Sequence, residues 1–465
     1  MANKKLNLLT TGFLYVLGSF FSQGLRFITL PIFSRLMSPV DYGYIGSYEV
    51  WVSILTVLVG LQTSGTIANA YLDFGKDKIN QYTSTVLTAA VVIFILMASI
   101  AFVGRRFLEN LFELNRVILF MGLVQCFFSY CILMLNSRYR MQDRVFSFLF
   151  FSISSSTLSI LSAMLMVYLV DENKYQYYIM GNVLSYSLIG TVTFIVIYTT
   201  GKKLYNRQMV QYALKLALPL VLHGLASVAL GRVNQMILLK FIGPFEAGIY
   251  NFGNNFAYIV NGIYTAFNQA YIPWYYKKLY NNETEVVKYA STNYMGVFTM
   301  FVGCLILAMP EIIKLMSTKE YYDAMYIVPI VIIGMYINFL YTFNVNYEFY
   351  KKKTQFIAAG TMLTALCNII LSLLLIKQFS IIGAAVATVI SSVLQLAFHF
   401  IIATRIIKQF ELGLAVFIKN ILIILIVTFV YYVTIENVFI RGGMICVLIL
   451  IAVYRGKSIV KTIRG

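Results

Sequence analysis

The chain has 465 residues, of which 60% are hydrophobic and 12% are charged, and its mean hydropathy is +0.79. These values are not those of a soluble globular protein, and they indicate a membrane protein. The formal net charge of +18 does not indicate nucleic-acid binding, because the basic residues lie in short segments between apolar runs and form no stripe with interleaved aromatics.

Apolar runs long enough to cross a bilayer follow one another along the whole chain. A span needs about 20 mostly apolar residues, and about fourteen such segments can be drawn. They cover residues 11–34, 43–71, 82–104, 117–136, 146–169, 177–199, 216–239, 247–273, 289–310, 325–349, 354–376, 380–403, 415–433 and 437–454. We therefore expect an all-α integral membrane protein embedded in the lipid bilayer. The connections between spans are too short to hold a catalytic domain.

Lysine and arginine are unevenly distributed between the two sets of alternating connections. If the N-terminus is cytoplasmic, the cytoplasmic segments hold about two thirds of the 36 basic residues. These segments include Lys4 and Lys5 at the start of the chain and the tail from Arg455 to Arg464. Because basic residues are retained on the cytoplasmic side, we expect both termini to be cytoplasmic.

A short pattern of base, proline, acid and glycine occurs twice. The two copies are RLMSPVDYG, with Arg35, Pro39, Asp41 and Gly43, and KFIGPFEAG, with Lys240, Pro244, Glu246 and Gly248. Six predicted spans separate the copies, so the second copy enters the membrane from the same side as the first. This spacing predicts two parallel six-helix repeats. The predicted lobes are residues 1–203 and 204–408, followed by two additional helices and a basic tail in 409–465.

Helix capping accounts for this motif without a ligand. Cations are favoured near helix C-termini and anions near helix N-termini, where an aspartate can also cap. Proline stops the preceding helix, and glycine allows close helix packing. We therefore interpret the motif as architectural.

Three segments resemble one membrane protein family. They are FITLPIFSRLMSPVDYGYIGSYEVW, ILLKFIGPFEAGIYNFGNNF and YKKKTQFIAAGTMLTALCNIILSLLLIKQFSIIGAAVATVISS. Together they resemble Wzx-type polysaccharide flippases, which transport the repeat units of O-antigen and capsule and belong to the multidrug/oligosaccharidyl-lipid/polysaccharide exporter superfamily. One departure is Asn234, where members of the family often have an aspartate.

The resemblance implies a two-lobed bundle whose central cavity opens alternately to each side of the cytoplasmic (inner) membrane. The implied cargo is an undecaprenyl-diphosphate-linked glycan, moved from the inner to the outer leaflet for surface polysaccharide synthesis. A polysaccharide polymerase or ligase is a further candidate partner. Neither the residues nor the resemblance implies a cofactor, a metal site or an enzyme activity.

Three charged residues lie deep within predicted spans. Arg26 and Arg232 occupy equivalent places in the two repeats. Two cations that face one cavity would suit a diphosphate, because guanidinium groups bind phosphate through paired hydrogen bonds. Glu49 is predicted at about the depth of Arg26, so these two could pair, whereas Arg232 has no acidic partner on its own or the next helix. Intramembrane charges of this kind are functional candidates by default.

Side-chain amides accompany these charges. Gln23, Asn234, Asn254 and Asn255 lie in helices that the resemblance places beside the cavity, where they could bind sugar hydroxyls. Amides also hold membrane helices together, so a packing role stays open for each.

Two further ionisable residues lie near the ends of their spans. We expect Glu348 to pair with the adjacent lysine cluster of residues 351–353, and we expect a hydrogen-bonded packing role for His399.

Three other functions remain open. A multidrug or cation antiporter of the same superfamily would need buried carboxylates, and Glu49 is the only acid well inside a predicted span. A flippase for the peptidoglycan lipid precursor would share the fold and the cargo chemistry. A glycan polymerase or ligase would need a large outer loop with catalytic bases, which this sequence does not contain.

Overall fold

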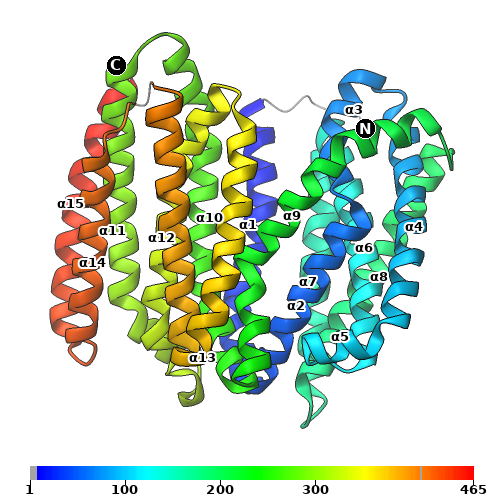
Figure 1. The fold of residues 1–465 in the computed structure, drawn as a ribbon, viewed down its shortest axis with the longest axis horizontal. Helices are drawn as coiled ribbons and strands as arrows, with labels where there is room; N and C mark the ends of the chain where they lie inside the picture. The colour runs from blue at the N-terminus through cyan, green and yellow to red at the C-terminus, as the bar shows by residue number, and fades with distance from the viewer. Residues whose placement is uncertain (1–7, 409–410, 465) are drawn as a thin grey trace. The chain divides into compact units, whose positions relative to one another are not determined.

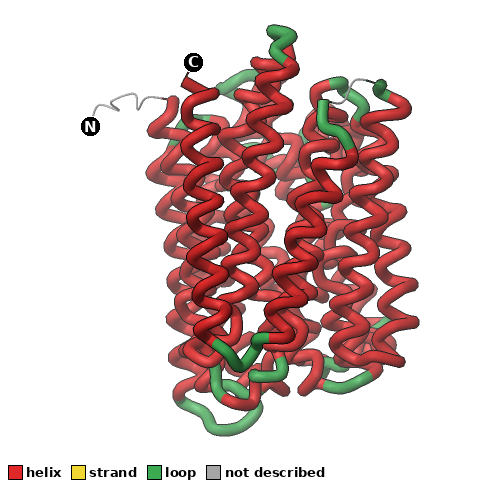
Figure 2. The backbone as a smooth tube through the Cα atoms, turned by 90° about the vertical axis from the view of Figure 1, so that its left-hand side faces the viewer, coloured by secondary structure: helices red, strands yellow, loops and turns green. Residues whose placement is uncertain are grey.

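Helices make up all the regular structure in residues 8–408 and 411–464, the part of the chain that the computed structural model describes (Figures 1 and 2). The helices are α1 (Leu8–Leu36), α2 (Pro39–Gly60), η1 (Thr63–Thr66), α3 (Ile67–Phe74), α4 (Ile79–Val103), α5 (Arg105–Phe112), α6 (Arg116–Met141), α7 (Val145–Tyr168), α8 (Lys174–Gly201), α9 (Arg207–Phe241), α10 (Pro244–Tyr280), α11 (Thr284–Met316), η2 (Lys319–Tyr321), α12 (Ala324–Tyr350), α13 (Thr354–Ile401), η3 (Ile402–Ile406), α14 (Leu414–Val433) and α15 (Val438–Arg464). The all-α class is therefore confirmed. Lys4 and Lys5 lie outside the described residues.

Within the described residues, 11 helices are long and apolar enough to cross a membrane. One of them, α13, contains two predicted spans and is interrupted at Ser380, where φ is 50° and ψ is −130°. Two more predicted spans, 11–34 and 247–273, fall within α1 and α10. The chain is a multi-span membrane protein, while the count of fourteen spans and the repeat architecture stay predictions.

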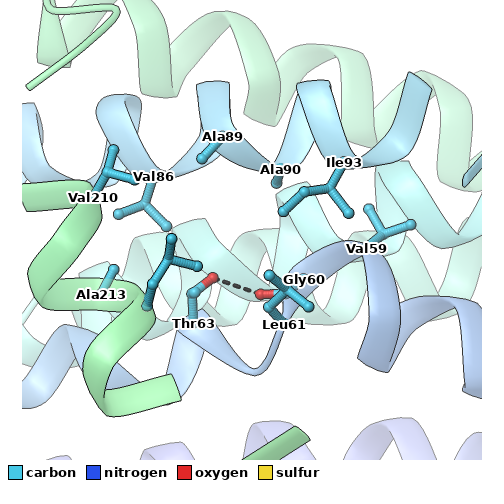
Figure 3. Close-up of a pocket in the computed structure, with 11 residues that line it drawn as sticks. Val59, Gly60, Leu61, Thr63, Val86, Ala89, Ala90, Ile93, Val210 and Ala213 are labelled. Atoms are coloured by element: carbon cyan, nitrogen blue, oxygen red, sulfur yellow. Dashed lines mark hydrogen bonds between the residues drawn. The ribbon is translucent and has the colours of Figure 1, made fainter. Parts of the chain in front are cut away.

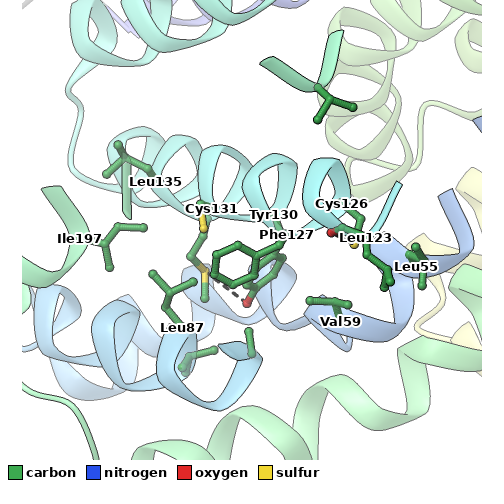
Figure 4. Close-up of a cluster of buried hydrophobic side chains, with 14 of the residues drawn as sticks. Leu55, Val59, Leu87, Leu123, Cys126, Phe127, Tyr130, Cys131, Leu135 and Ile197 are labelled. Atoms are coloured by element: carbon green, nitrogen blue, oxygen red, sulfur yellow. Dashed lines mark hydrogen bonds between the residues drawn. The ribbon is translucent and has the colours of Figure 1, made fainter. Parts of the chain in front are cut away.

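The helices form two compact units, Met1–Gly248 and Ile249–Gly465. Helix α9 belongs to the first unit, where it packs along α2. The core of this unit surrounds α6, whose Cys126, Tyr130 and Cys131 are fully buried between apolar side chains of α2, α4 and α8 (Figure 4). The predicted lobe boundaries at residues 203 and 408 stay a prediction about the repeat.

The first copy of the repeated motif caps α2, with Ser38 as the N-cap and Asp41 at the third helical position. The Asp41 backbone N–H donates to the Ser38 hydroxyl over 3.3 Å, and the Ser38 backbone N–H donates to the Asp41 carboxylate over 3.0 Å. This reciprocal capping box satisfies backbone donors that the first turn of a helix leaves unpaired. The second Asp41 carboxylate oxygen accepts the backbone N–H of Tyr175 over 3.0 Å, which ties α8 to the start of α2.

The glycines of the two motif copies contact each other's prolines. A Cβ atom on Gly43 would lie 2.1 Å from the carbonyl oxygen of Pro244, and one on Gly248 would lie 1.7 Å from that of Pro39. Both separations are far below van der Waals contact, so only glycine allows this backbone approach. The expectation that these glycines permit close packing is confirmed.

In the second unit, α11 packs against α12, α14 and α15. The side chain of Arg441 on α15 is almost fully buried, and its guanidinium donates to the carbonyl of Thr434 over 2.6 Å and to that of Ile435. It also forms an ion pair with Glu311 on α11. Arg441 thus joins the end of α14 to α11, so the two C-terminal helices are packed parts of this unit.

Candidate functional site

Helix α2 is fixed to the end of α5 and to α6 along one face. The Ser47 hydroxyl donates to the Phe112 carbonyl over 2.6 Å, the Tyr48 hydroxyl donates to Gln125 over 2.7 Å, and the Trp51 indole donates to the Leu119 carbonyl over 3.0 Å. Gly122 leaves room for the Trp51 ring, because a Cβ atom there would lie 2.6 Å from it. These anchors fix the rotation of α2 and therefore the direction in which Glu49 projects.

Glu49 projects toward α9 and forms an ion pair with the Arg232 guanidinium. The exposed fractions of the two side chains are 25% for Arg232 and 31% for Glu49. Both side chains are therefore partly accessible, and a ligand could reach the guanidinium without unfolding a helix. This differs from the expectation that Glu49 would pair with Arg26, because α9 packs directly on α2 and brings a distant segment of sequence to the carboxylate.

Arg26 on α1 belongs to the same charged cluster. Its side chain is exposed, and it interacts electrostatically with Glu49, with Arg232 and with Tyr178 and Tyr186 of α8. One carboxylate cannot neutralise two guanidinium groups, so the cluster of Arg26, Glu49 and Arg232 has a surplus of one positive charge. Such a surplus in a membrane-embedded segment favours an anionic ligand.

The predicted amides do not all share this place. Asn234 is buried, and the period of an α-helix sets it about 200° around α9 from Arg232. Gln23 lies in α1, but its side chain is outside the described residues. Asn254 and Asn255 belong to the second unit. Asn254 is buried, while the amide of Asn255 donates to the carbonyl of Asn251 over 3.0 Å. Sugar binding by these amides stays a prediction.

A small pocket in the first unit lies apart from this charged cluster. It is lined by apolar residues of α2, α4 and α9, among them Val59, Val86 and Ala213, together with Thr63 (Figure 3). The Thr63 hydroxyl donates to the Gly60 carbonyl over 2.6 Å. No charged side chain lines it, so it offers nothing to a diphosphate.

In the second unit, Glu348 pairs with His399 and not with the lysine cluster that follows it in the sequence. The neighbouring Lys351 ammonium instead lies 5.5 Å from the centroids of the Tyr347 and Tyr350 rings. Sequence reasoning missed this pair because its members are separated by a whole helix. Among the described residues no group of three or more histidine, cysteine or acidic side chains could hold a metal ion.

Comparisons with known proteins identify the chain's relatives. The sequence model of a family described as polysaccharide biosynthesis protein matches residues 8–279, more than half of the chain. A Staphylococcus aureus protein named capsular polysaccharide biosynthesis protein CapF is 23% identical over 412 residues, which are 82% of this chain and 95% of that protein. The Haemophilus influenzae Lsg locus putative protein 1 is 21% identical over 360 residues, 76% of this chain and 87% of that protein.

The fold is similar to those of two solved transporters. A structure of the lipid II flippase MurJ in an inward closed conformation matches with a TM-score of 0.70 at 17% identity, covering 97% of this chain and all of that one. An inward-facing multidrug resistance MATE family transporter of the MOP superfamily matches with a TM-score of 0.66 at 11% identity, covering 83% and 96%. At these identities the similarity establishes the fold alone.

Proposed function

Because the chain belongs to the polysaccharide biosynthesis protein family, we propose that it is a flippase for undecaprenyl-diphosphate-linked oligosaccharide repeat units. In this proposal it moves them by alternating access to the outer leaflet of the cytoplasmic membrane, with both termini cytoplasmic. The observation that carries the proposal is the charged cluster of Arg26, Glu49 and Arg232, with its surplus positive charge.

The chemistry of the cluster suits a lipid-linked diphosphate. Arginine presents several N–H donors in a rigid fork that matches phosphate oxygens, and its charge does not depend on pH. Arg26 would bind the diphosphate first, because its side chain is exposed. Arg232 would then exchange Glu49 for a phosphate oxygen, while Glu49 keeps its guanidinium oriented in the absence of cargo.

The exchange at Arg232 also offers a reason for release. Tight diphosphate binding by two arginines would hold the cargo, whereas a carboxylate that competes for one of them weakens the complex. A transporter needs its site to bind well enough to load and weakly enough to unload. Glu49 would supply the second property.

Two alternative functions share this fold. A cation antiporter fits the charged cluster less well than the proposed flippase does, and a peptidoglycan-precursor flippase fits it equally well. A cation antiporter needs a carboxylate that is free to bind its substrate, and Glu49 is already engaged by Arg232. A peptidoglycan-precursor flippase would use the same diphosphate chemistry, and the similarity to the lipid II flippase keeps it as the second candidate. The family and structural relatives are named as biosynthesis proteins and transporters, which does not favour a polymerase or ligase.

The decisive experiment compares undecaprenyl-linked glycans extracted from cells with and without the protein. We expect complete repeat units to accumulate on the lipid and surface polysaccharide to disappear when the gene is deleted. The mass of the accumulated glycan would identify the sugar. Accumulated peptidoglycan precursor would support the second candidate, and an unchanged lipid pool with altered sensitivity to cationic drugs would support the antiporter.

A further inference from the structure

The second unit contains an ionisable pair that the diphosphate site does not use. His399 Nδ1 lies 2.8 Å from Glu348 Oε1, and both side chains are completely buried. Glu348 is on the last turn of α12, and His399 is near the end of α13. The two helices pack closely along their length, so the pair is sealed between them.

Several polar atoms at this place have no hydrogen-bond partner among the described residues of the protein. These are the second carboxylate oxygen of Glu348, Nε2 of His399 and both side-chain polar atoms of Asn344, which precedes Glu348 by one helical turn. Leaving such atoms unpaired costs about 1–3 kcal/mol each. A pair that served only to hold two helices together would be expected to satisfy its atoms, so the unused capacity points to a site that changes its state.

The surroundings contain few other ionisable groups. The Tyr341 ring on α12 lies 5.6 Å from the His399 ring and interacts electrostatically with Glu348. The Glu411 carboxylate, beyond the end of η3, accepts a hydrogen bond from Tyr275 of α10 at 3.5 Å. Other charged groups on the elements around the pair lie toward or at the surface, among them Lys351 on α12, Lys377 on α13, Arg405 on η3 and Lys419 on α14.

Burial favours the arrangements of the pair that have no net charge. A carboxylate with an imidazolium and a carboxylic acid with a neutral imidazole both contain one exchangeable proton and have no net charge. Adding or removing a proton would leave a net charge on two completely buried side chains, which costs several kcal/mol. Proton exchange therefore requires that α12 and α13 separate enough to admit water.

We propose that Glu348 and His399 form a proton-binding site that couples transport to the proton gradient. The site retains one proton while it is sealed and releases that proton from the carboxyl to water when it opens, which leaves carboxylate and neutral imidazole. This inference rests on the proposed flippase function for its role in transport, whereas the proton site itself does not depend on the cargo.

The site offers a conservative variant and a matched control. Glu348→Gln removes the titrating carboxyl but retains an oxygen that accepts the His399 Nδ1–H hydrogen bond, so a merely structural role would survive. Glu311→Gln changes another carboxylate of the same unit, which pairs with Arg441 and is 45% exposed.

The first measurement is infrared difference spectroscopy of the purified full-length protein between acidic and neutral pH. We expect a carboxyl band that is missing in Glu348→Gln and retained in Glu311→Gln. The second measurement reconstitutes the protein in lipid vesicles with undecaprenyl-diphosphate-linked glycan purified from cells that make it. A gradient of one pH unit should then give up to about a tenfold asymmetry of glycan between leaflets if one proton moves per molecule.

In Glu348→Gln vesicles, we expect glycan to equilibrate between leaflets without asymmetry, while Glu311→Gln behaves as the wild type. A wild-type gradient response that persists in Glu348→Gln, or a wild-type spectrum without the Glu348 band, would overturn the proton site. Wild-type vesicles that move no glycan but show the Glu348 band would reject the flippase function and leave the proton site standing.

Discussion

Replacing Arg232 by alanine should abolish glycan export while leaving a folded protein in the membrane. A pair of charges in contact is worth about 4 kcal/mol at an effective dielectric constant of 20. The exposed fractions of 25% and 31% for Arg232 and Glu49 let water screen this attraction, so its net contribution to stability falls to about 1 kcal/mol. Hydrogen bonds from a cation to phosphate contribute about 1.5–3 kcal/mol, so cargo binding should weaken roughly 10- to 150-fold.

The assay uses cells whose chromosomal gene carries the substitution at native expression. Undecaprenyl-linked glycan is quantified by mass spectrometry, and the protein in the membrane fraction is quantified by immunoblot. We expect the lipid-linked glycan of Arg232→Ala cells to rise to the level of the deletion strain, with at least half of the wild-type protein present.

Glu49→Gln is the matched control, because it breaks the same ion pair from the other side. It leaves both guanidinium groups and raises the local charge surplus, so loading should persist and release should slow. If the pair were only structural, Glu49→Gln and Arg232→Ala would reduce export equally and through loss of protein. Normal export in Arg232→Ala cells would refute the diphosphate site.

Three further substitutions test the packing of the two units. Ser38→Ala removes the capping box of α2 and should lower the free energy of unfolding by about 1 kcal/mol, seen as a lower Tm in detergent. Gly248→Ala should reduce the folded yield, because the new Cβ atom would lie 1.7 Å from the Pro39 carbonyl oxygen. Gly65→Ala is the control and should not reduce the yield, because the space around Gly65 is open. Equal yields of the two variants would contradict the close approach. Arg441→Leu should lower the Tm by freeing the end of α14, and an unchanged Tm would show that its buried hydrogen bonds contribute nothing net.

Features that depend on neighbouring residues could be predicted from the sequence. The long helices follow from runs of apolar residues, and the capping role of Asp41 follows from an acid two residues after a proline, because both effects act within one or two turns. The need for glycine at positions 43 and 248 could also be expected. Its reason, the contact of each glycine with the other copy's proline, depends on the tertiary structure.

The partners of the buried charges could not be predicted, because they are set by packing between distant helices. Glu49 is at a similar predicted depth to Arg26, yet its ion pair is with Arg232. Glu348 precedes Lys351 by three residues, an arrangement that often gives a salt bridge on a helix surface. Here Glu348 faces α13, while Lys351 lies over two tyrosine rings. Sequence separation is therefore a poor guide to partners once a helix is buried on several sides.

The two proposals place on separate clusters the two tasks that a proton-driven exporter of an anion would perform. Binding a diphosphate requires a surplus of positive charge, whereas binding a proton requires an acid whose charge is not already neutralised by arginine. If both were placed in one cluster, the acid would pair permanently with a guanidinium and lose its proton. In this protein the half-buried acid, Glu49, is paired with Arg232, and the completely buried acid, Glu348, is paired with a histidine. His399→Arg would give Glu348 an arginine partner, which would fix a carboxylate there. This variant should therefore lose the asymmetry of glycan between leaflets that a pH gradient produces in vesicles.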